Sequence, residues 1–261
     1  MAGCPNGWQN SEKCYKTRTG RIIVNATNPQ HVWVIGFPKS GNTWISYLCS
    51  YCLNLPFSNF GNPKESQQKS WIKELTRGGN DWSPMEGYSS VKKTHKYPDQ
   101  VPFKDSLVIY VIRDPRDVFV SYHYFMRSTN ARMLGRARYY LLGLLGKHQQ
   151  IKWFLSKWMQ HVQLWTPHSQ VIVCYEKLLS NGSEYLNELL SVDPFFVDGT
   201  IVNQAYENFS FDKMSGGRKP GSEDQKSFFR KGISGDWQNH FSGEEAELFN
   251  RSLKIYQSSI R

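Results

Sequence analysis

The sequence lacks a long run of apolar residues. Its longest apolar stretch, at residues 139–145, falls well short of the ~20 residues that a membrane-spanning helix requires. The N-terminus, MAGCPNGWQNSEKCYK, also lacks the apolar segment of a secretory signal. These two absences exclude a membrane-spanning helix and predict a cytoplasmic protein.

Metal-binding patterns are also scarce. The chain has five cysteines, and Cys49-x-x-Cys52 has no second C-x-x-C or H-x-H pair that could complete a zinc site. Two buried cysteines on one helix are the simpler interpretation of this spacing. We therefore expect no metal site.

Repeats, low-complexity tracts and long linkers are absent as well. A chain of 261 residues is within the range of one α/β domain, and a hydrophobic content of 39% excludes intrinsic disorder. The sequence predicts an N-terminal extension over residues 1–29 and one domain over residues 30–261.

Negative charge is missing from one long window. No Asp or Glu occurs between Val118 and Tyr175, although seven Lys and Arg residues do. The whole chain has 32 Lys and Arg residues against 22 Asp and Glu residues, a formal net charge of +10. A nucleic-acid surface, an acidic membrane, a polyanionic small ligand or a merely solvated helix face fits this charge, so the charge does not choose among them.

Short apolar runs alternate with segments of helical spacing. The run SLVIYVI at residues 106–112 is typical of a strand that is buried on both faces of a parallel sheet, and Asp114-Pro115 then provides a helix N-cap and first residue. The pattern predicts a single-domain α/β fold, with a central parallel sheet flanked by helices and ligands at the carboxyl ends of the strands. The expected strands are 31–36, 89–94, 106–112 and 171–175, and the expected helices are 42–53, 115–121, 149–164, 183–190 and 243–256.

An anion-binding loop is predicted directly after the first strand. The segment GFPKSGNTW at residues 36–44 matches the pattern G-x-x-x-x-G-K-[ST] at Gly41 and Thr43, but Asn42 stands at the lysine position and the lysine is Lys39. Successive backbone N–H groups before a helix still favour an anion, whereas a nucleoside triphosphatase needs its lysine in the usual place. A turn that binds nothing is the alternative.

Three further segments accompany this loop: VKKTH at residues 91–95, VIRDPRDVFVSY at residues 111–122 and FRKGISGDW at residues 229–237. Together with FPKSGNTW they resemble the signatures of the cytosolic sulfotransferase family, in the family's order and close to its spacing. The resemblance covers about residues 30–260. It implies a five-stranded parallel, P-loop-like fold that binds 3'-phosphoadenosine 5'-phosphosulfate and transfers its sulfuryl group to a hydroxyl or an amine.

The resemblance also implies which residues hold this nucleotide. The loop would hold the 5'-phosphosulfate, Trp44 would lie on one face of the adenine, and Phe211 would lie on its other face. The implied 5'-phosphosulfate set is Lys39, Ser40, Gly41, Asn42, Thr43 and Trp44; the 3'-phosphate set is Arg113, Ser121, Arg230, Lys231 and Gly232; and the adenine set is Tyr175, Ser210, Phe211 and Met214.

Four residues are implied in catalysis. His95 would take the acceptor proton as general base, Lys39 would neutralise charge on the bridging oxygen, and Lys93 would assist the transferring group. Ser121 completes the set, and His123 is a candidate pocket residue and the next choice of base. The reaction is an in-line displacement in which positioning and charge stabilisation dominate, and Arg, Lys and N–H donors can bind the donor without a metal.

Departures from the family pattern leave the acceptor open. Asn42 stands where the family usually has threonine, and Phe209 replaces a threonine near the adenine. We expect a small-molecule acceptor and neither a nucleic-acid nor a membrane partner. The alternatives are a P-loop-type nucleotide kinase and a nonenzymatic polyanion-binding protein. Candidates for the acceptor pocket, for which core packing is the other interpretation, are Trp71, Trp82, Tyr88, Tyr122 and Phe125.

The family's dimerisation element is also altered. It has the pattern K-x-x-x-T-V-x-x-x-E after the G-D-W motif, and the same offsets here hold Gln238, Ser242-Gly243 and Glu247. Three of the four key positions differ. We therefore expect a monomer, or a homodimer that uses another surface.

Overall fold

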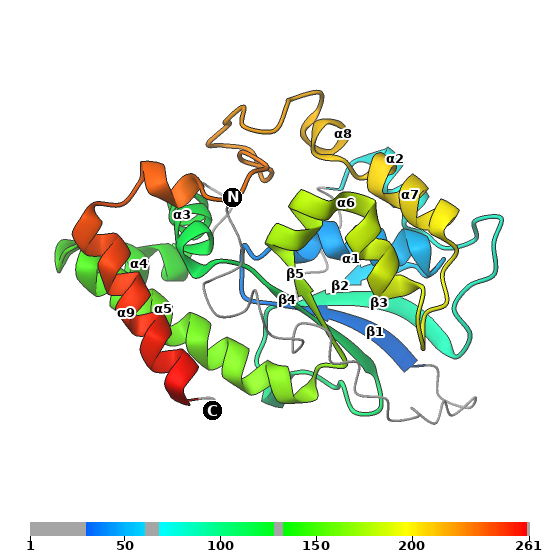
Figure 1. Cartoon of the computed structure of the whole chain (residues 1–261), viewed down its shortest axis with the longest axis horizontal. Helices are drawn as coiled ribbons and strands as arrows, with labels where there is room; N and C mark the ends of the chain where they lie inside the picture. Colours follow the sequence, from blue (N-terminus) through cyan, green and yellow to red (C-terminus); the bar gives the residue numbers. More distant parts are fainter. Residues whose placement is uncertain (1–29, 61–67, 128–132, 260–261) are drawn as a thin grey trace.

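The computed structural model describes residues 30–60, 68–127 and 133–259 (Figure 1). Five strands form one sheet in the order β2-β3-β1-β4-β5, and every neighbouring pair is parallel. The direction of winding reverses between β1 and β4, and ligands of such sheets bind at this position. The strands are β1 (Gln30–Ile35), β2 (Phe57–Asn59), β3 (Tyr88–Thr94), β4 (Leu107–Ile112) and β5 (Val171–Cys174).

The helices form two groups around the sheet. In Figure 1, α1, α6 and α7 pack together on one side, and α3, α4, α5 and α9 pack together on the other. These helices are α1 (Asn42–Cys52), α2 (Ser70–Leu75), α3 (Pro115–Arg127), α4 (Met133–Leu144), α5 (Lys147–Trp165), α6 (Tyr175–Leu190), α7 (Gly199–Asn208), α8 (Phe211–Ser215) and α9 (Gly243–Ser259). Short 3₁₀ helices are η3 (Pro98–Gln100), η4 (Thr166–His168) and η5 (Asp236–Asn239).

The predicted fold class is confirmed, and each predicted strand and helix is present with shifted ends. The backbone N–H of Arg116 donates to Asp114 Oδ1 at 2.9 Å, so Asp114 caps α3 as expected. The sequence patterns did not predict β2, α2, α4, α7 or α8. The expected N-terminal extension, residues 1–29, lies outside the described residues.

The core lies against both faces of the sheet. All six residues of β4 are buried, which explains why its sequence is apolar without alternation. Cys49 and Cys52 are buried in α1, and burial raises the pKa of the Cys49 thiol to about 12, so the two thiols belong to the core. None of the helices in the described part of the chain is both long and apolar enough to cross a membrane.

Candidate active site

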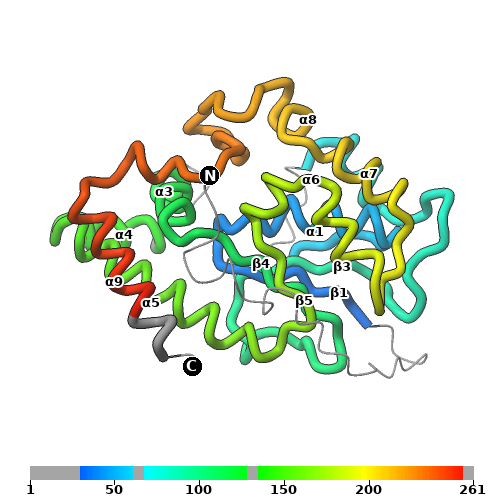
Figure 2. Tube along the Cα trace, viewed as in Figure 1, coloured from blue at the N-terminus to red at the C-terminus, as the bar shows by residue number. Residues whose placement is uncertain are grey.

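The carboxyl ends of the central strands open into a cavity of about 1360 Å³. The loop after β1, the second half of α3, the start of α6, α8 and residues 219–234 form its walls. Figure 2 shows the segment after α8, in orange, crossing from α8 toward α3. The lining includes the predicted residues Lys39, Gly41, Asn42, Thr43, Trp44, Lys93, His95, Arg113, Ser121, Tyr175, Ser210, Phe211, Met214, Arg230, Lys231 and Gly232.

The acceptor-pocket candidates divide between the cavity and the core. Tyr122 and Phe125 line the cavity. His123 is not among the residues that line it, so the prediction that it is a pocket residue is wrong. Its Nδ1 forms a hydrogen bond with the Tyr139 hydroxyl at 2.9 Å. The candidates that pack in or against the core instead are Trp71, Trp82 and Tyr88.

The loop after β1 enters α1 through left-handed backbone. Lys39 has φ of 74°, and Gly41, the N-cap of α1, has φ of 99°. A Cβ on Gly41 would lie 2.5 Å from Cδ2 of Tyr175, so only glycine allows the loop this close to α6. The cap provides no side-chain acceptor and the first turn of α1 has no acidic residue, which leaves its N–H groups for an anion.

Four buried polar atoms near this loop have no hydrogen-bond partner among the described residues. They are the acceptor Asn42 Oδ1 and three atoms that can donate, Ser40 Oγ, Trp44 Nε1 and Arg113 Nε. Ser40 is fully buried and is the one predicted loop residue that does not line the cavity. Buried polar atoms are normally paired, so donors without partners beside a cavity fit a ligand rich in acceptor oxygens.

Two lysines on neighbouring elements approach the same part of the cavity. Lys93, at the end of β3, donates from Nζ to Thr43 Oγ1 at 2.8 Å, and burial lowers its pKa to about 8. Lys39 Nζ lies 4.3 Å from the centre of the Phe228 ring. Burial, helped by the charges of Arg113 and Lys93, lowers the pKa of Lys39 to about 7. Neither lysine has a carboxylate partner within the described ranges, so a bound anion would be their counter-ion.

His95 follows β3 and is held by its Nδ1 atom. Nδ1 lies 2.8 Å from the carbonyl oxygen of Gly36 and 2.9 Å from Asn42 Nδ2, and that same Nδ2 donates to Gly36 O at 2.7 Å. The ring is exposed where it lines the cavity, and protein encloses its other sides. This enclosure, followed by the charge of Lys93, lowers the pKa of His95, so the imidazole is neutral at pH 7.

Arg113 closes the end of β4. Its Nη1 donates to the carbonyl oxygen of Lys39 at 3.2 Å and its Nη2 to that of Ile233 at 3.3 Å. The guanidinium carbon lies 4.3 Å from the centre of the Tyr175 ring. Arg113 therefore joins the loop after β1 to residues 230–234, and Ser121 lines the same cavity from α3.

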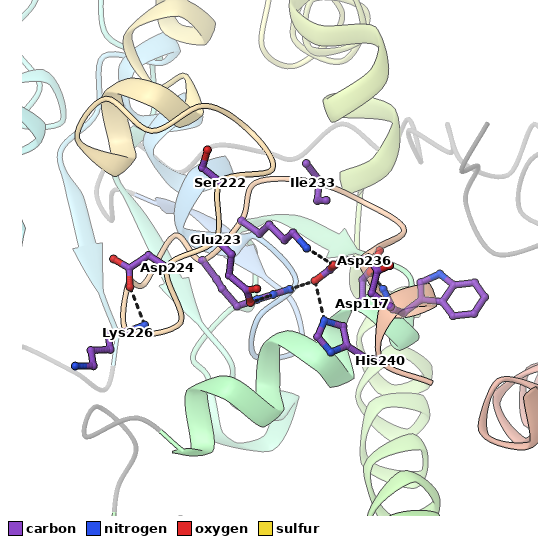
Figure 3. A network of polar contacts seen from close by, with 12 residues as sticks. Asp117, Ser222, Glu223, Asp224, Lys226, Ile233, Asp236 and His240 are labelled. Carbon is purple, nitrogen blue, oxygen red and sulfur yellow. Dashed lines mark hydrogen bonds and ion pairs between the residues drawn. The ribbon is translucent and has the colours of Figure 1, made fainter. Parts of the chain in front are cut away.

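Asp236 organises the second group of cations (Figure 3). Its carboxylate accepts from Arg230 Nη2 at 2.5 Å and from Lys231 Nζ at 2.6 Å, and it lies 3.2 Å from His240 Nε2. Arg230 also pairs with Glu223. Burial alone would raise the pKa of Asp236, but the hydrogen bonds from Lys231 and Arg230 outweigh it and hold the pKa well below its usual value. Asp236 is therefore ionised and fixes both cations.

Asp117 anchors the same segment to α3. Its Oδ2 accepts from the backbone N–H of Gly235 at 2.7 Å, and its Oδ1 accepts from that of Trp237 at 3.0 Å. The sequence did not single out Asp117 and Asp236. Both lie inside the motifs VIRDPRDVFVSY and FRKGISGDW, and the signal is an acid beside the basic residues of each motif.

Aromatic rings form the other end of the cavity. The ring centre of Trp44 lies 5.8 Å from that of Tyr175 and 5.9 Å from that of Tyr206. Tyr206 also lines the cavity, and the sequence did not single it out. A Cβ on Gly232 would overlap the ring of Phe211, so glycine lets the segment approach this aromatic residue closely. The arrangement provides flat apolar surfaces next to the cations.

Known proteins with similar sequences are sulfotransferases. The chain is 27% identical to sulfotransferase 2A1 of Macaca fascicularis over 98% of this chain and 92% of that protein. It is also 27% identical to the 3-beta-hydroxysteroid sulfotransferase of Cavia porcellus over 87% of this chain and 82% of that protein.

Solved structures with a similar fold agree with the sequence matches. The mouse sulfotransferase SULT7A1 complexed with PAP has a TM-score of 0.60 at 17% identity, covering 88% of this chain and 85% of that chain. Retinol dehydratase in a complex with retinol and PAP has a TM-score of 0.55 at 18% identity, covering 88% of this chain and 81% of that chain. At these identities the likeness shows the fold.

The family match covers most of the chain. The sequence pattern of the sulfotransferase domain matches residues 29–258. It favours sulfuryl transfer over the kinase and the nonenzymatic polyanion-binding protein that the sequence left as alternatives. The resemblance indicated by the four motifs is therefore confirmed, and the chain belongs to the sulfotransferase family.

Proposed function

We propose that this sulfotransferase transfers a sulfuryl group from 3'-phosphoadenosine 5'-phosphosulfate to a hydroxyl or amine of a small molecule, with His95 as general base. The observation that carries the proposal is the meeting, in one cavity, of a neutral histidine with two lysines that have no carboxylate partner in the described ranges. Such a site suits a reaction in which a proton leaves one end and negative charge develops at the other.

The donor nucleotide fits the residues that are present. The N–H groups at the start of α1 and the unpaired Ser40 Oγ would donate hydrogen bonds to the 5'-phosphosulfate. Arg113 and Arg230 would hold the 3'-phosphate. Trp44 and Phe211 line the same cavity and offer flat surfaces for the adenine. PAP is 3'-phosphoadenosine 5'-phosphate, the product that this donor leaves after sulfuryl transfer. It is bound in two similarly folded proteins, mouse SULT7A1 and retinol dehydratase, which supports this assignment.

The role of His95 follows from its hydrogen bonds. An Nδ1–H that donates to Gly36 O leaves the lone pair of Nε2 free to take the acceptor proton. The acceptor oxygen or nitrogen then forms the new bond to sulfur, while the bond from sulfur to the bridging oxygen breaks. The electron pair of that bond leaves with the 5'-phosphate, so atoms and charge balance.

Lys39 is proposed to stabilise the departing phosphate. Its pKa of about 7 means that the ammonium form is only partly populated in the free protein at neutral pH. Dianionic phosphate beside it would raise that pKa and keep the charge in place. Lys93, held against Thr43, would act on the transferring group, and Ser121 would donate from α3.

The acceptor end favours a small molecule with an apolar body. The cavity lining includes Tyr122, Phe125, Met126 and Phe228, and the ring centres of Phe125 and Phe228 lie 5.2 and 4.3 Å from Lys39 Nζ. One relative is named a 3-beta-hydroxysteroid sulfotransferase, and one similarly folded protein holds retinol; both names refer to apolar alcohols. We therefore propose an apolar or aromatic acceptor, without choosing between oxygen and nitrogen.

The test is an acceptor screen with the donor supplied. Phenols, alkyl alcohols and amines are incubated with the full chain, and mass spectrometry detects an added sulfuryl group. The proposal expects products with at least one apolar acceptor and about 10²- to 10³-fold slower product formation with Lys39→Met. Tight PAP binding without product from any acceptor class would overturn the proposed reaction, and product formation without any requirement for the 3'-phosphate would overturn the donor assignment.

A further inference from the structure

The helix α4 presents an apolar stripe to solvent. Four large apolar side chains of this segment are exposed, and so is Ala137. Their exposed fractions are 46% for Tyr140, 63% for Leu141, 83% for Leu144 and 70% for Leu145. Tyr140, Leu141 and Leu144 are spaced i+3, i+4 and i+7 from Ala137, which places them along one face of the helix, and Leu145 directly follows its last residue. Such a stripe normally faces the core of a protein.

The opposite face of α4 is already packed. Tyr139 is 1% exposed, its hydroxyl forms a hydrogen bond with His123, and Gln150 donates to its carbonyl oxygen at 3.0 Å. Rotation of α4 to bury the stripe would pull Tyr139 out of the core. The stripe is therefore held outward. The helix α4 lies at the left edge of the molecule in Figure 1.

Basic residues flank the stripe on both sides. Arg136 and Arg138 lie one residue before and after Ala137, which is about 100° to either side of it around the helix. Lys152 follows on α5, and Lys147 pairs with Glu245. No Asp or Glu occurs in the sequence between Val118 and Tyr175. The surroundings of the stripe thus complement an anionic partner.

We propose that α4 docks on the surface of a bilayer that contains anionic lipids. The leucines and Tyr140 would enter the boundary between headgroups and acyl chains, and Arg136 and Arg138 would reach the lipid phosphates. This is binding at the surface, and it departs from the sequence-based expectation of no membrane partner. A symmetric contact between two copies is less favourable, because it brings the same arginines toward one another.

The position of α4 connects this surface with the cavity. Gly135, near the start of the helix, lines the cavity together with Met126, and the stripe begins two residues later. Docking would hold this rim of the cavity at the membrane, where apolar molecules accumulate. This consequence rests on the proposed apolar acceptor, whereas the docking itself does not depend on the reaction.

The test is co-sedimentation of the full chain with lipid vesicles. One set contains phosphatidylcholine alone, and the other contains phosphatidylcholine with phosphatidylserine. We expect binding to the anionic set that weakens as salt rises. Leu144→Ser with Leu145→Ser should weaken it about tenfold or more, and Arg136→Gln with Arg138→Gln about fivefold for each charge removed.

A second exposed apolar pair provides a matched control. Val192 and Phe196, in the loop between α6 and α7, are 42% and 72% exposed but lie beside Asp193 and Asp198. Phe196→Ser should leave vesicle binding unchanged. Circular dichroism and PAP calorimetry on every variant check that the fold and the nucleotide site are intact.

Several results would overturn the proposal. These are no co-sedimentation with anionic vesicles at low salt, or equal binding of the wild type and the Leu144→Ser, Leu145→Ser variant. Light scattering that shows a dimer, which this variant dissociates, would assign the stripe to a second copy of the chain. Failure of the acceptor screen would leave the vesicle result unaffected, so the two proposals fail separately.

Discussion

The two basic groups of the cavity are built in opposite ways. Lys39 and Lys93 have no carboxylate partner among the described residues, and burial depresses the pKa of both. Arg230 and Lys231, in contrast, are held by the ionised carboxylate of Asp236. The first group depends on a ligand for its counter-charge, whereas the second is preorganised without one. In the proposed function the first group stabilises the charge that develops in the reaction and the second binds the nucleotide, so the two kinds of charge are placed by different means in one cavity.

The largest expected effect concerns His95, which lies beside the lysine group. His95→Ala should lower turnover about 10²- to 10⁴-fold, because the acceptor proton has no base, and should leave PAP affinity nearly unchanged. Single-turnover kinetics and calorimetry measure the two quantities. His123→Gln, which alters a histidine outside the cavity lining, is the control. Retained turnover in His95→Ala, together with lost turnover in His123→Gln, would identify His123 as the general base instead.

Lys39 should affect chemistry and product binding together. Lys39→Met should slow single turnover about 10²- to 10³-fold, because charge on the departing phosphate is no longer neutralised, and should also weaken PAP binding. Lys226→Met, at an exposed lysine of the segment after α8, should change neither quantity. Weaker PAP binding with a normal transfer rate would show that Lys39 binds the nucleotide but does not stabilise the transition state.

Removal of the carboxylate that holds the preorganised group should lower the stability of the fold. Asp236→Asn leaves Arg230 and Lys231 without their shared charge and should lower the unfolding free energy by about 3 kcal/mol. A loss of that size corresponds to a melting temperature ~6–12 °C lower. Added PAP should restore part of it, because the 3'-phosphate supplies the missing charge. Asp224→Asn, at an exposed residue, is the control, and equal melting temperatures for all three proteins would refute the role of Asp236.

Arg113 should separate phosphate recognition from adenine recognition. Arg113→Ala should weaken binding of PAP about 10- to 100-fold and should change the affinity for the 3'-dephospho analogue far less, because charge-assisted contacts to the 3'-phosphate are lost. Calorimetry with both ligands measures the difference. Equal losses for the two ligands would place Arg113 away from that phosphate.

The smallest expected effect is the pH dependence of PAP binding. The free lysines lose their protons as the pH rises through about 7 for Lys39 and about 8 for Lys93, so affinity should fall about tenfold between pH 7 and 9. The phosphates are already dianionic in this range. Calorimetry in buffers of different ionisation enthalpy should detect proton uptake on binding. Lys39→Met should lose the lower step, and an affinity that rises with pH would contradict the assignment.

Some parts of the molecule could be predicted from sequence because local patterns report them. The apolar run of β4 and the Asp114 cap of α3 depend on neighbours in the chain, so their positions were readable. The helix α4 was not predicted because its apolar run at residues 139–145, YYLLGLL, is nearly continuous and so shows no clear helical period.

The residues of the site also differ in how far local sequence patterns predict them. The residues of contiguous motifs, such as Lys39 to Trp44, were recognised together, although burial of Ser40 behind the loop was not predicted. The partner of Asp117 is the N–H of Gly235, far along the chain. Pairing at that separation depends on how α3 and the last motif approach each other, and a single sequence contains no direct signal for it.

The contacts around Nδ1 of His95 also determine the starting state of the reaction. Nδ1 lies within hydrogen-bond distance of both Gly36 O and Asn42 Nδ2, so it donates to the first in one tautomer and accepts from the second in the other. The base proposed above needs the first tautomer, in which Nε2 carries no proton. The amide of Asn42, which also donates to Gly36 O, therefore bears on the population of the imidazole form that is ready to take a proton.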